Sequence, residues 1–315
     1  MKALTIGVHV ADRTATATIA RIEAADRAGV DVAWLTSGGV APDPLATFAA
    51  ATRSAETIEF GTCIVPTFPR HPLALAQSAL VVNDLAPGRL RLGVGPSHEP
   101  AVTRTYNMPF NRPLEHLREY VTILATLFKD GKVSFHGKRL DAEAQIPNPV
   151  DIRVMISALR TNAFTLAGEL TEGGITWVSP MPHVTNVAKP AIEAGAAKAG
   201  RKAPPVVVHL PVVVSEDREA VRAATVQQFN FYPRLPFYSA MFQEAGFPEA
   251  KDGTFSDGMA DALAISGRPD EVERRLRELP GQGGGELIAD IIRIPGESAS
   301  FDRTVEVLGA LAKAD

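Results

Sequence analysis

Ser97 and His98 follow the apolar run Gly93-Val94-Gly95 in the segment RLRLGVGPSHEP, residues 89–100. A Gly-x-Gly pair after a strand can begin a dinucleotide-binding fingerprint, which needs a third glycine and a helix whose N-terminus holds the pyrophosphate. Here His98 stands at the third position, and the following residues, EPAVTRTYNMPFNRP, are not expected to form a helix. We therefore interpret the glycines as close-packing positions in a strand that carries Ser97 and His98 into a site.

Other polar side chains that could do chemistry also stand where apolar runs end. They are an imidazole, three hydroxyl groups and a guanidinium group, from His9, Thr36, Ser37, Ser179 and Arg160. No lysine stands at such a position, which argues against a Schiff-base aldolase or a pyridoxal enzyme. Metal-dependent hydrolases need clustered histidine and carboxylate ligands, whereas the segment GVHVA offers one histidine and no nearby carboxylate. The sequence therefore predicts no metal site.

These polar residues lie at the ends of apolar segments that alternate with helical patterns. The expected strands are residues 3–8, 30–35, 58–65, 90–95, 153–159, 175–178, 206–214 and 287–294. Such continuously apolar strands are typical of a parallel sheet buried on both faces. Repeated strand–helix units of this number favour a (β/α)₈ TIM barrel, with an open doubly wound sheet as the alternative. In such barrels the active site lies at the C-terminal ends of the strands.

Two segments interrupt the alternation. Residues 129–149 form a polar excursion after the fourth helix, and we expect a small hairpin or an extended arm there. Residues 233–267 form an irregular, Gly- and Pro-rich insertion between the seventh and eighth strands. Aromatic residues gather at its start, FNFYPRLPFYSAMF, where Tyr232 and Tyr238 suggest a hydrophobic lid over a flat substrate. Packing of the barrel or a dimer contact is the alternative. No repeat or linker divides the chain, so we expect one domain, residues 1–315.

The composition limits the partners of the protein. The net charge of −4 and the lack of a basic cluster argue against nucleic acid and anionic membranes. The most apolar run, VVVHLPVVV, is too short to span a bilayer, and the N-terminus turns polar too early for a signal peptide. Cys63 is the single cysteine, which excludes an intrachain disulfide and fits a reducing compartment. We expect a cytoplasmic protein that acts on small molecules.

A longer pattern joins the third and fourth strands. Its pieces are GTCIVP at 61–66, RHP at 70–72, PGRL at 87–90 and LGVG at 92–95. Together with LAGEL at 166–170 and GRPDEVERRLREL at 267–279, this pattern resembles the luciferase-like monooxygenase superfamily. The resemblance is strongest to the branch of oxidoreductases that depend on the deazaflavin coenzyme F420. It implies a barrel, usually a homodimer, with the cofactor ring at the C-terminal strand ends.

The resemblance also implies roles for particular residues. A bulge with a non-prolyl cis peptide supports the ring in relatives, and the matching residues are Cys63, Ile64 and Val65. The cofactor phosphate is held by backbone N–H groups that match Ala158, Leu159, Arg160 and Thr161. Relatives often have Gly-Pro where Arg160-Thr161 stands, so Arg160 either pairs with the phosphate or the acidic tail, or is a solvated surface residue. Ser97 and Ser179 are further candidates for contact with the cofactor.

Proton transfer is where the sequence departs most from this pattern. Many relatives place an acid–base pair after the second strand, but here Thr36 and Ser37 occupy those positions. Their hydroxyl groups can bind the ring or the substrate, yet an unactivated hydroxyl is a poor general acid at neutral pH. His98 is the first candidate for the proton donor and His9 the second, with Ser37 as a further catalytic candidate.

Three functions are consistent with these residues. The leading hypothesis is F420-dependent hydride transfer between the deazaflavin C5 and a C=C, C=N or carbonyl/alcohol carbon of a small substrate. The alternative is an FMN-dependent monooxygenase that uses reduced flavin and oxygen. The third is a barrel that binds flavin or another ligand without turnover, because the usual acid–base pair is absent. The identity of the substrate does not follow from the sequence.

Overall fold

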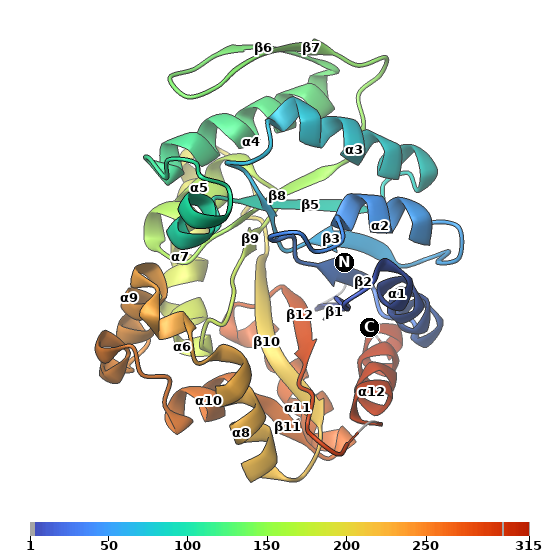
Figure 1. The fold of residues 1–315 in the computed structure, drawn as a ribbon, viewed down its shortest axis with the longest axis vertical. Coiled ribbons are helices and arrows are strands. Elements are labelled where there is room, and N and C mark those ends of the chain that lie inside the picture. The colour runs from blue at the N-terminus through green and yellow to red at the C-terminus, as the bar shows by residue number, and fades with distance from the viewer. Residues whose placement is uncertain (1–3, 298, 315) are drawn as a thin grey trace.

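Eight parallel strands close into a TIM barrel in the computed structural model, which describes residues 4–297 and 299–314 (Figure 1). In order around the barrel they are β1 (Thr5–His9), β2 (Val32–Leu35), β3 (Glu59–Thr62), β5 (Leu90–Gly95), β8 (Arg153–Ser157), β9 (Gly174–Ile175), β10 (Val206–Val214) and β12 (Glu286–Ile291). Pairing of β12 with β1 and of β9 with β10 closes the ring. The predicted barrel is confirmed, and the open sheet is excluded.

Helices surround the barrel. They are α1 (Ala15–Ala28), α2 (Pro44–Ala51), α3 (Pro72–Leu85), α4 (Pro113–Asp130), α5 (Thr161–Leu170), α6 (Met181–His183), α7 (Lys189–Lys198), α8 (Arg218–Phe229), α9 (Pro236–Glu244), α10 (Asp257–Leu263), α11 (Pro269–Arg277) and α12 (Ser300–Ala314). Side chains fix several helix starts: Asp43 caps α2 by accepting from Ala46 N–H at 2.9 Å, and His71 caps α3. Proline stands in the first turn of both helices, where its missing N–H leaves no hydrogen bond unmade.

Alternate residues of the barrel strands point inward and form three layers. The layer at the N-terminal ends is charged: Arg91 forms ion pairs with Glu59 and Glu286, and Arg153 pairs with Glu59 at 2.6 Å. The middle layer is apolar and includes Trp34, Met155, Ile175, Val207 and Ile288. Two residues further along the strands, a third layer is polar and aromatic. Its members include His9, Cys63, Ser157, Trp177, His209 and Asp290. The charged groups at the N-terminal end are paired with one another, whereas the C-terminal end presents imidazole, thiol, hydroxyl and carboxylate groups in one layer.

The polar excursion forms the antiparallel hairpin β6 (Lys132–His136) and β7 (Asp141–Gln145), as expected. Figure 1 shows this hairpin beside α4, at the edge of the molecule. The remaining strands extend the barrel sheet: β4 (Val65–Pro66) pairs with β5, and β11 (Ile265–Gly267) pairs with the end of β10. Within the described ranges, no helix is long and apolar enough to cross a membrane.

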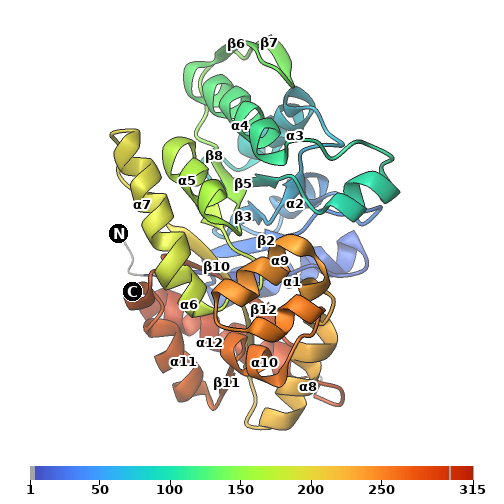
Figure 2. The same ribbon diagram turned by 90° about the vertical axis from the view of Figure 1, so that its left-hand side faces the viewer.

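Three local expectations are wrong. The insertion at 233–267 is largely helical, because Pro236 starts α9 and the Ser256 hydroxyl caps α10; Figure 2 shows α10 next to α8. A helical turn, Ala101–Thr105, follows the Gly-x-Gly run, since the His98 carbonyl accepts from the N–H groups of residues 101 and 102. This turn is too short for a dinucleotide-binding helix. The sixth strand ends at Ile175 instead of residue 178, where the backbone turns to a positive φ of 52°.

Candidate active site at the C-terminal end of the barrel

Asp290 is the centre of the polar layer. Its Oδ1 atom lies 3.3 Å from Nδ1 of His9, and its Oδ2 atom lies 3.3 Å from Nε2 of His209. Gln228, on α8, donates to Oδ2 at 2.9 Å. Burial alone would raise the pKa of Asp290, but the hydrogen bonds from His209 and His9 outweigh burial and hold it well below its usual range. One ionised carboxylate thus joins strands β1, β10 and β12.

His209 is fixed as a neutral ring. The backbone N–H of Val178 donates to its Nδ1 atom at 3.2 Å, so Nδ1 must accept and Nε2 carries the proton. Trp177 stacks on the imidazole with 3.6 Å between the ring centroids. Burial lowers the pKa of His209, although the Asp290 carboxylate opposes this effect. His209 therefore donates one hydrogen bond to Asp290 and has no site for a second proton.

His9 has a different environment. Its Nδ1 atom faces the carboxylate of Asp290, and its Nε2 atom lies 3.4 Å from the hydroxyl of Thr36 just beyond β2. Catalytic hydrogen bonds are often this long in the absence of substrate. The structure therefore places two of the predicted site residues, His9 and Thr36, in one hydrogen-bonded row that ends on Asp290.

The bulge expected after the third strand is present between β3 and β4. The Cys63–Ile64 peptide is cis, and Cys63 is buried inside the barrel. The Ser37 N–H donates to the Ile64 carbonyl at 3.2 Å, so the loop after β2 is tied to the bulge. Burial raises the pKa of the Cys63 thiol, and the charge of Asp290 adds to this rise. Cys63 is thus a neutral thiol. Val65 continues the chain as the first residue of β4.

His98 lies away from this row and faces the insertion. Its ring approaches Tyr238 edge-on at 5.5 Å and Tyr232 at 6.4 Å between centroids. Burial lowers the pKa of His98, and its ring forms no hydrogen bond or ion pair with another described residue. The neighbouring Ser97 adopts a positive φ of 62°, which turns the chain out of β5. Gly93 is a close-packing position, as interpreted above, because a Cβ atom there would lie 2.0 Å from the Thr62 carbonyl oxygen.

The residues predicted to hold a phosphate lie between β8 and α5. Ala158 is buried, Leu159 accepts a hydrogen bond from His183 Nε2 at 2.9 Å, and Thr161 is the first residue of α5. Arg160 precedes the helix, and its side chain makes no capping bond but pairs with Glu244 of α9 at 2.7 Å. The first N–H groups of α5 therefore lack a side-chain cap.

Ser179 follows β9 in the chain, and its hydroxyl forms no hydrogen bond with any described residue. Its hydroxyl is fully buried. A buried hydroxyl without a partner costs about 1–3 kcal/mol, so such a group in a barrel mouth suits a polar ligand atom.

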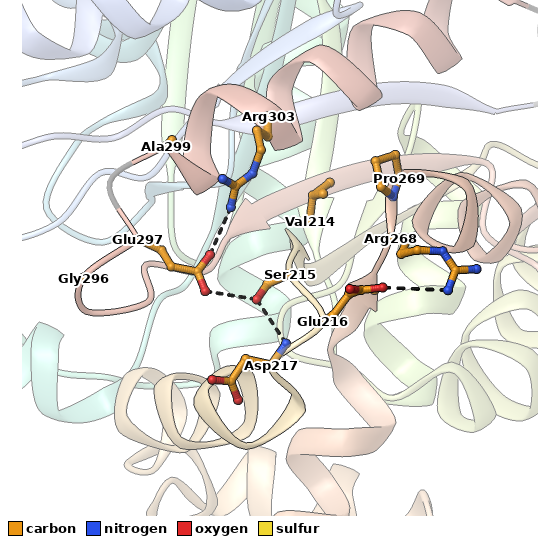
Figure 3. A pocket seen from close by; sticks show the side chains of 11 residues that line it. Val214, Ser215, Glu216, Asp217, Arg268, Pro269, Gly296, Glu297, Ala299 and Arg303 are labelled. Carbon is orange, nitrogen blue, oxygen red and sulfur yellow. Dashed lines mark hydrogen bonds and ion pairs between the residues drawn. The ribbon is translucent and has the colours of Figure 1, made fainter.

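Two pockets adjoin these strand ends. The smaller, of about 230 Å³, is lined by His9, Arg21, Gln228, Asp290, Arg293 and Phe301. The larger, of about 570 Å³, lies where β10 and β11 end, before α12. Figure 3 shows that both of its arginines are already paired, Arg303 with Glu297 at 3.0 Å and Arg268 with Glu216 at 3.7 Å. The smaller pocket gives access to the His9–Asp290 pair, whereas the residues predicted to hold the cofactor lie outside its lining.

The chain matches the family model described as luciferase-like monooxygenase over residues 4–285. It is 26% identical over 285 residues to a 5,10-methylenetetrahydromethanopterin reductase from Methanolobus tindarius, covering 84% of this chain and 87% of the relative. It is 28% identical over 261 residues to an F420-dependent glucose-6-phosphate dehydrogenase from Nakamurella multipartita, covering 78% and 75%.

A solved structure of an F420-dependent secondary alcohol dehydrogenase, in complex with an F420-acetone adduct, has the same fold. Its TM-score is 0.80 at 17% identity, covering 98% of this chain and 97% of that chain. At this identity the likeness concerns the fold alone, whereas the family model spans most of the sequence. The chain therefore belongs to the luciferase-like monooxygenase family of enzymes.

Proposed function

We propose that the protein is an F420-dependent oxidoreductase, which transfers a hydride between the deazaflavin C5 and a carbon atom of a small organic substrate. The observation that carries this proposal is the polar layer at the barrel mouth, in a family whose named relatives include F420-dependent enzymes. The cofactor supplies the hydride chemistry when it is bound, and the protein supplies orientation and electrostatics.

The residues present fit such a cofactor. The uncapped N-terminus of α5 offers free N–H groups and a positive dipole end for the phosphate, with Thr161 as its first residue. Ser179 offers a buried hydroxyl that has no protein partner in the described chain. The bulge at Cys63 and Ile64, with Ser37 bonded behind it, forms an apolar support for a flat ring. When the cofactor binds, Arg160 exchanges its ion pair with Glu244 for one with the phosphate or the acidic tail of the cofactor.

Cofactor binding tests this proposal. Fluorescence titrations with F420 and FMN are expected to give a micromolar Kd for F420 and a much weaker one for FMN. Arg160→Gln is expected to weaken F420 binding at least about 10-fold, since a hydrogen bond to a charged group contributes about 1.5–3 kcal/mol and about 1.4 kcal/mol corresponds to a factor of ten. The matched control is Arg118→Gln, which breaks another ion pair, with Glu169 at 2.6 Å, on α4.

The alternatives make different predictions. Tight FMN binding with F420 no better than millimolar would refute the proposal in favour of the monooxygenase, which oxygen uptake with reduced flavin then measures. A protein that binds F420 but turns over no enone, imine, ketone or alcohol would instead be a binding barrel. Equal affinities of the two arginine variants would remove Arg160 from the cofactor site.

A further inference from the structure

We propose that Asp290, His9 and Thr36 form a proton relay that serves the oxygen atom of a carbonyl or alcohol substrate. The inference rests on the proposed function and deepens it, because it names the proton path and the substrate class. Neither Asp290 nor the pairing of His9 with Thr36 follows from the motifs of the sequence.

Asp290 can only accept hydrogen bonds, because its carboxylate is ionised and buried. It accepts from His209 and Gln228 through Oδ2 at 3.3 and 2.9 Å, which leaves Oδ1 for His9 at 3.3 Å. The Nδ1 atom of His9 must therefore carry a proton. Asp290 thus fixes the orientation of the His9 ring, in the way a carboxylate orients the histidine of a hydrolase triad. It is a positioning residue.

The two histidines on Asp290 must then be opposite tautomers. His209 carries its proton on Nε2, because the Val178 N–H occupies Nδ1 at 3.2 Å. His9 carries its proton on Nδ1 and keeps the Nε2 lone pair for the hydroxyl of Thr36 at 3.4 Å. Protonation of Nε2 is compatible with the same neighbour, since the Thr36 oxygen can accept as well as donate. Of the two rings, only His9 can therefore gain and lose a proton without breaking a hydrogen bond.

The surroundings of His9 suit an imidazolium ring that forms and disappears. The Asp290 carboxylate stabilises the positive charge, and Trp177 lies perpendicular to the imidazole with 5.8 Å between the ring centroids. Two guanidinium groups line the same pocket, and Asp12 pairs with both, with Arg21 at 2.6 Å and with Arg293 at 3.7 Å. His98 has no comparable partner and lies among aromatic rings, where burial disfavours its charged form. The geometry therefore assigns the role of proton donor and acceptor to His9 and not to His98.

Reduction of a carbonyl group takes one hydride at carbon and one proton at oxygen. The hydride, with its electron pair, would come from the bound cofactor, and the C=O π pair then moves to the oxygen. The Thr36 hydroxyl gives its proton to that oxygen and regains one from Nε2 of His9. His9 becomes neutral on Asp290 and is recharged from water through the adjoining pocket. Oxidation of an alcohol runs the same proton path in reverse, with Nε2 as the final acceptor.

The first test reads tautomers and needs no turnover. In protein labelled with ¹⁵N-histidine, long-range ¹H–¹⁵N spectra distinguish Nδ1–H from Nε2–H rings, and His9→Gln and His209→Gln assign the signals. We expect Nδ1–H for His9 and Nε2–H for His209. Asp290→Asn is expected to change the His9 signals and to leave those of His136, which pairs with Asp141 on the exposed hairpin, unchanged. A neutral His9 ring that carries its proton on Nε2 and none on Nδ1 would overturn the relay, while F420 binding would still decide the proposed function.

The second test reads kinetics with acetone, cyclohexanone and acetophenone as probes and reduced F420 as donor. His9→Gln and Asp290→Asn are expected to lower kcat at least about 100-fold, as for loss of general acid catalysis, with the Kd of F420 unchanged. Thr36→Val is expected to lose activity similarly and Thr36→Ser to retain it. His136→Gln is the matched control, because it removes another His–Asp pair at 3.1 Å. Unimpaired His9→Gln, a loss confined to His98→Gln, or reduction of none of the ketones would overturn the relay.

Discussion

Trp34 fills the centre of the barrel because the positions that face its indole ring have no side chains. A Cβ atom on Gly7 would lie 2.3 Å from Nε1 of Trp34, and one on Gly61 would lie 2.3 Å from Cε3. Both distances are far below van der Waals contact, and Trp34 is fully buried in a closed ring of strands. The indole cannot yield in such a layer, so glycine at both positions is a condition for the barrel floor beneath the site.

Replacement of one of these glycines tests this packing. Gly61→Ala is expected to lower the free energy of unfolding by about 1–3 kcal/mol, the usual cost of overpacking a core. Urea denaturation measures this change. The control is Gly38→Ala, since no heavy atom lies within 4 Å of a Cβ atom placed there. Equal stability of the two variants would show that the Trp34 layer adapts and is not close-packed.

Some residues of the candidate site could be predicted from the sequence, and others could not. His9 and Thr36 could be predicted because each ends an apolar run, where barrels place their active sites. His209 and Asp290 could not, because each lies within a strand among apolar residues. The spacing does carry a signal that these two side chains face into the barrel. His209 stands two residues after Val207, and Asp290 two residues after Ile288, and both of these apolar residues face inward. This spacing can be used only when it is known which alternate residues of each strand point into the barrel. That choice depends on how the strands close into a ring.

The helices of the insertion between β10 and β12 bring aromatic rings over the barrel mouth. Tyr232 and Tyr238 are buried with 4.6 Å between their ring centroids, and the Tyr232 hydroxyl accepts from Nε1 of Trp177 at 2.5 Å. Helix α9 is also bound to the start of α5 through Glu244 and Arg160. The insertion is therefore attached to the barrel mouth at two points, and its role as a lid over the substrate stays a prediction.

The hydrogen bond between the insertion and the barrel gives a prediction. Tyr232→Phe leaves the Trp177 N–H without a partner, so we expect a loss of about 1–3 kcal/mol in the free energy of unfolding. Tyr238→Phe is the matched control, because its hydroxyl makes no hydrogen bond to the rest of the described chain, and we expect little change. Chemical denaturation compares the two, and substrate KM values report the lid. Equal losses would mean that the hydroxyl of Tyr232 does not hold the insertion in place.

Elements were easier to predict by type than by extent. Each strand of the barrel has an apolar core that the sequence identifies, and the hairpin at 129–149 follows from its polar, turn-rich composition. The insertion was expected to be irregular because prolines and glycines are frequent there. Those prolines stand instead at helix starts, as Pro236 does, where they favour a helix. Local composition cannot distinguish a proline that begins a helix from one that prevents it.

The whole molecule combines a closed barrel with several histidines that burial holds in the neutral form. Burial is the main cause that lowers the pKa of four of them, namely His98, His116, His183 and His209. They are distributed over β5, α4, α6 and β10 or adjoining loops, so their protonation opposes folding around most of the barrel. Asp290 titrates in a different pH range from these histidines. Its pKa is lowered, so its carboxylate becomes protonated only in strong acid.

These shifts predict how stability depends on pH. An unfolded histidine takes up its proton near pH 6.5, about its ordinary pKa, whereas the buried neutral rings take theirs up only at lower pH. Below that value the unfolded chain binds more protons than the native one, so the free energy of unfolding falls as the pH falls. The slope is about 1.4 kcal/mol per pH unit for each such histidine, before the lowered pKa is reached. Urea midpoints between pH 8 and pH 5 measure it, and His116→Gln is expected to flatten the slope by removing one ring. Stability that stays constant or rises towards pH 5 would contradict the neutral state of these histidines, including the His209 ring that supports Asp290.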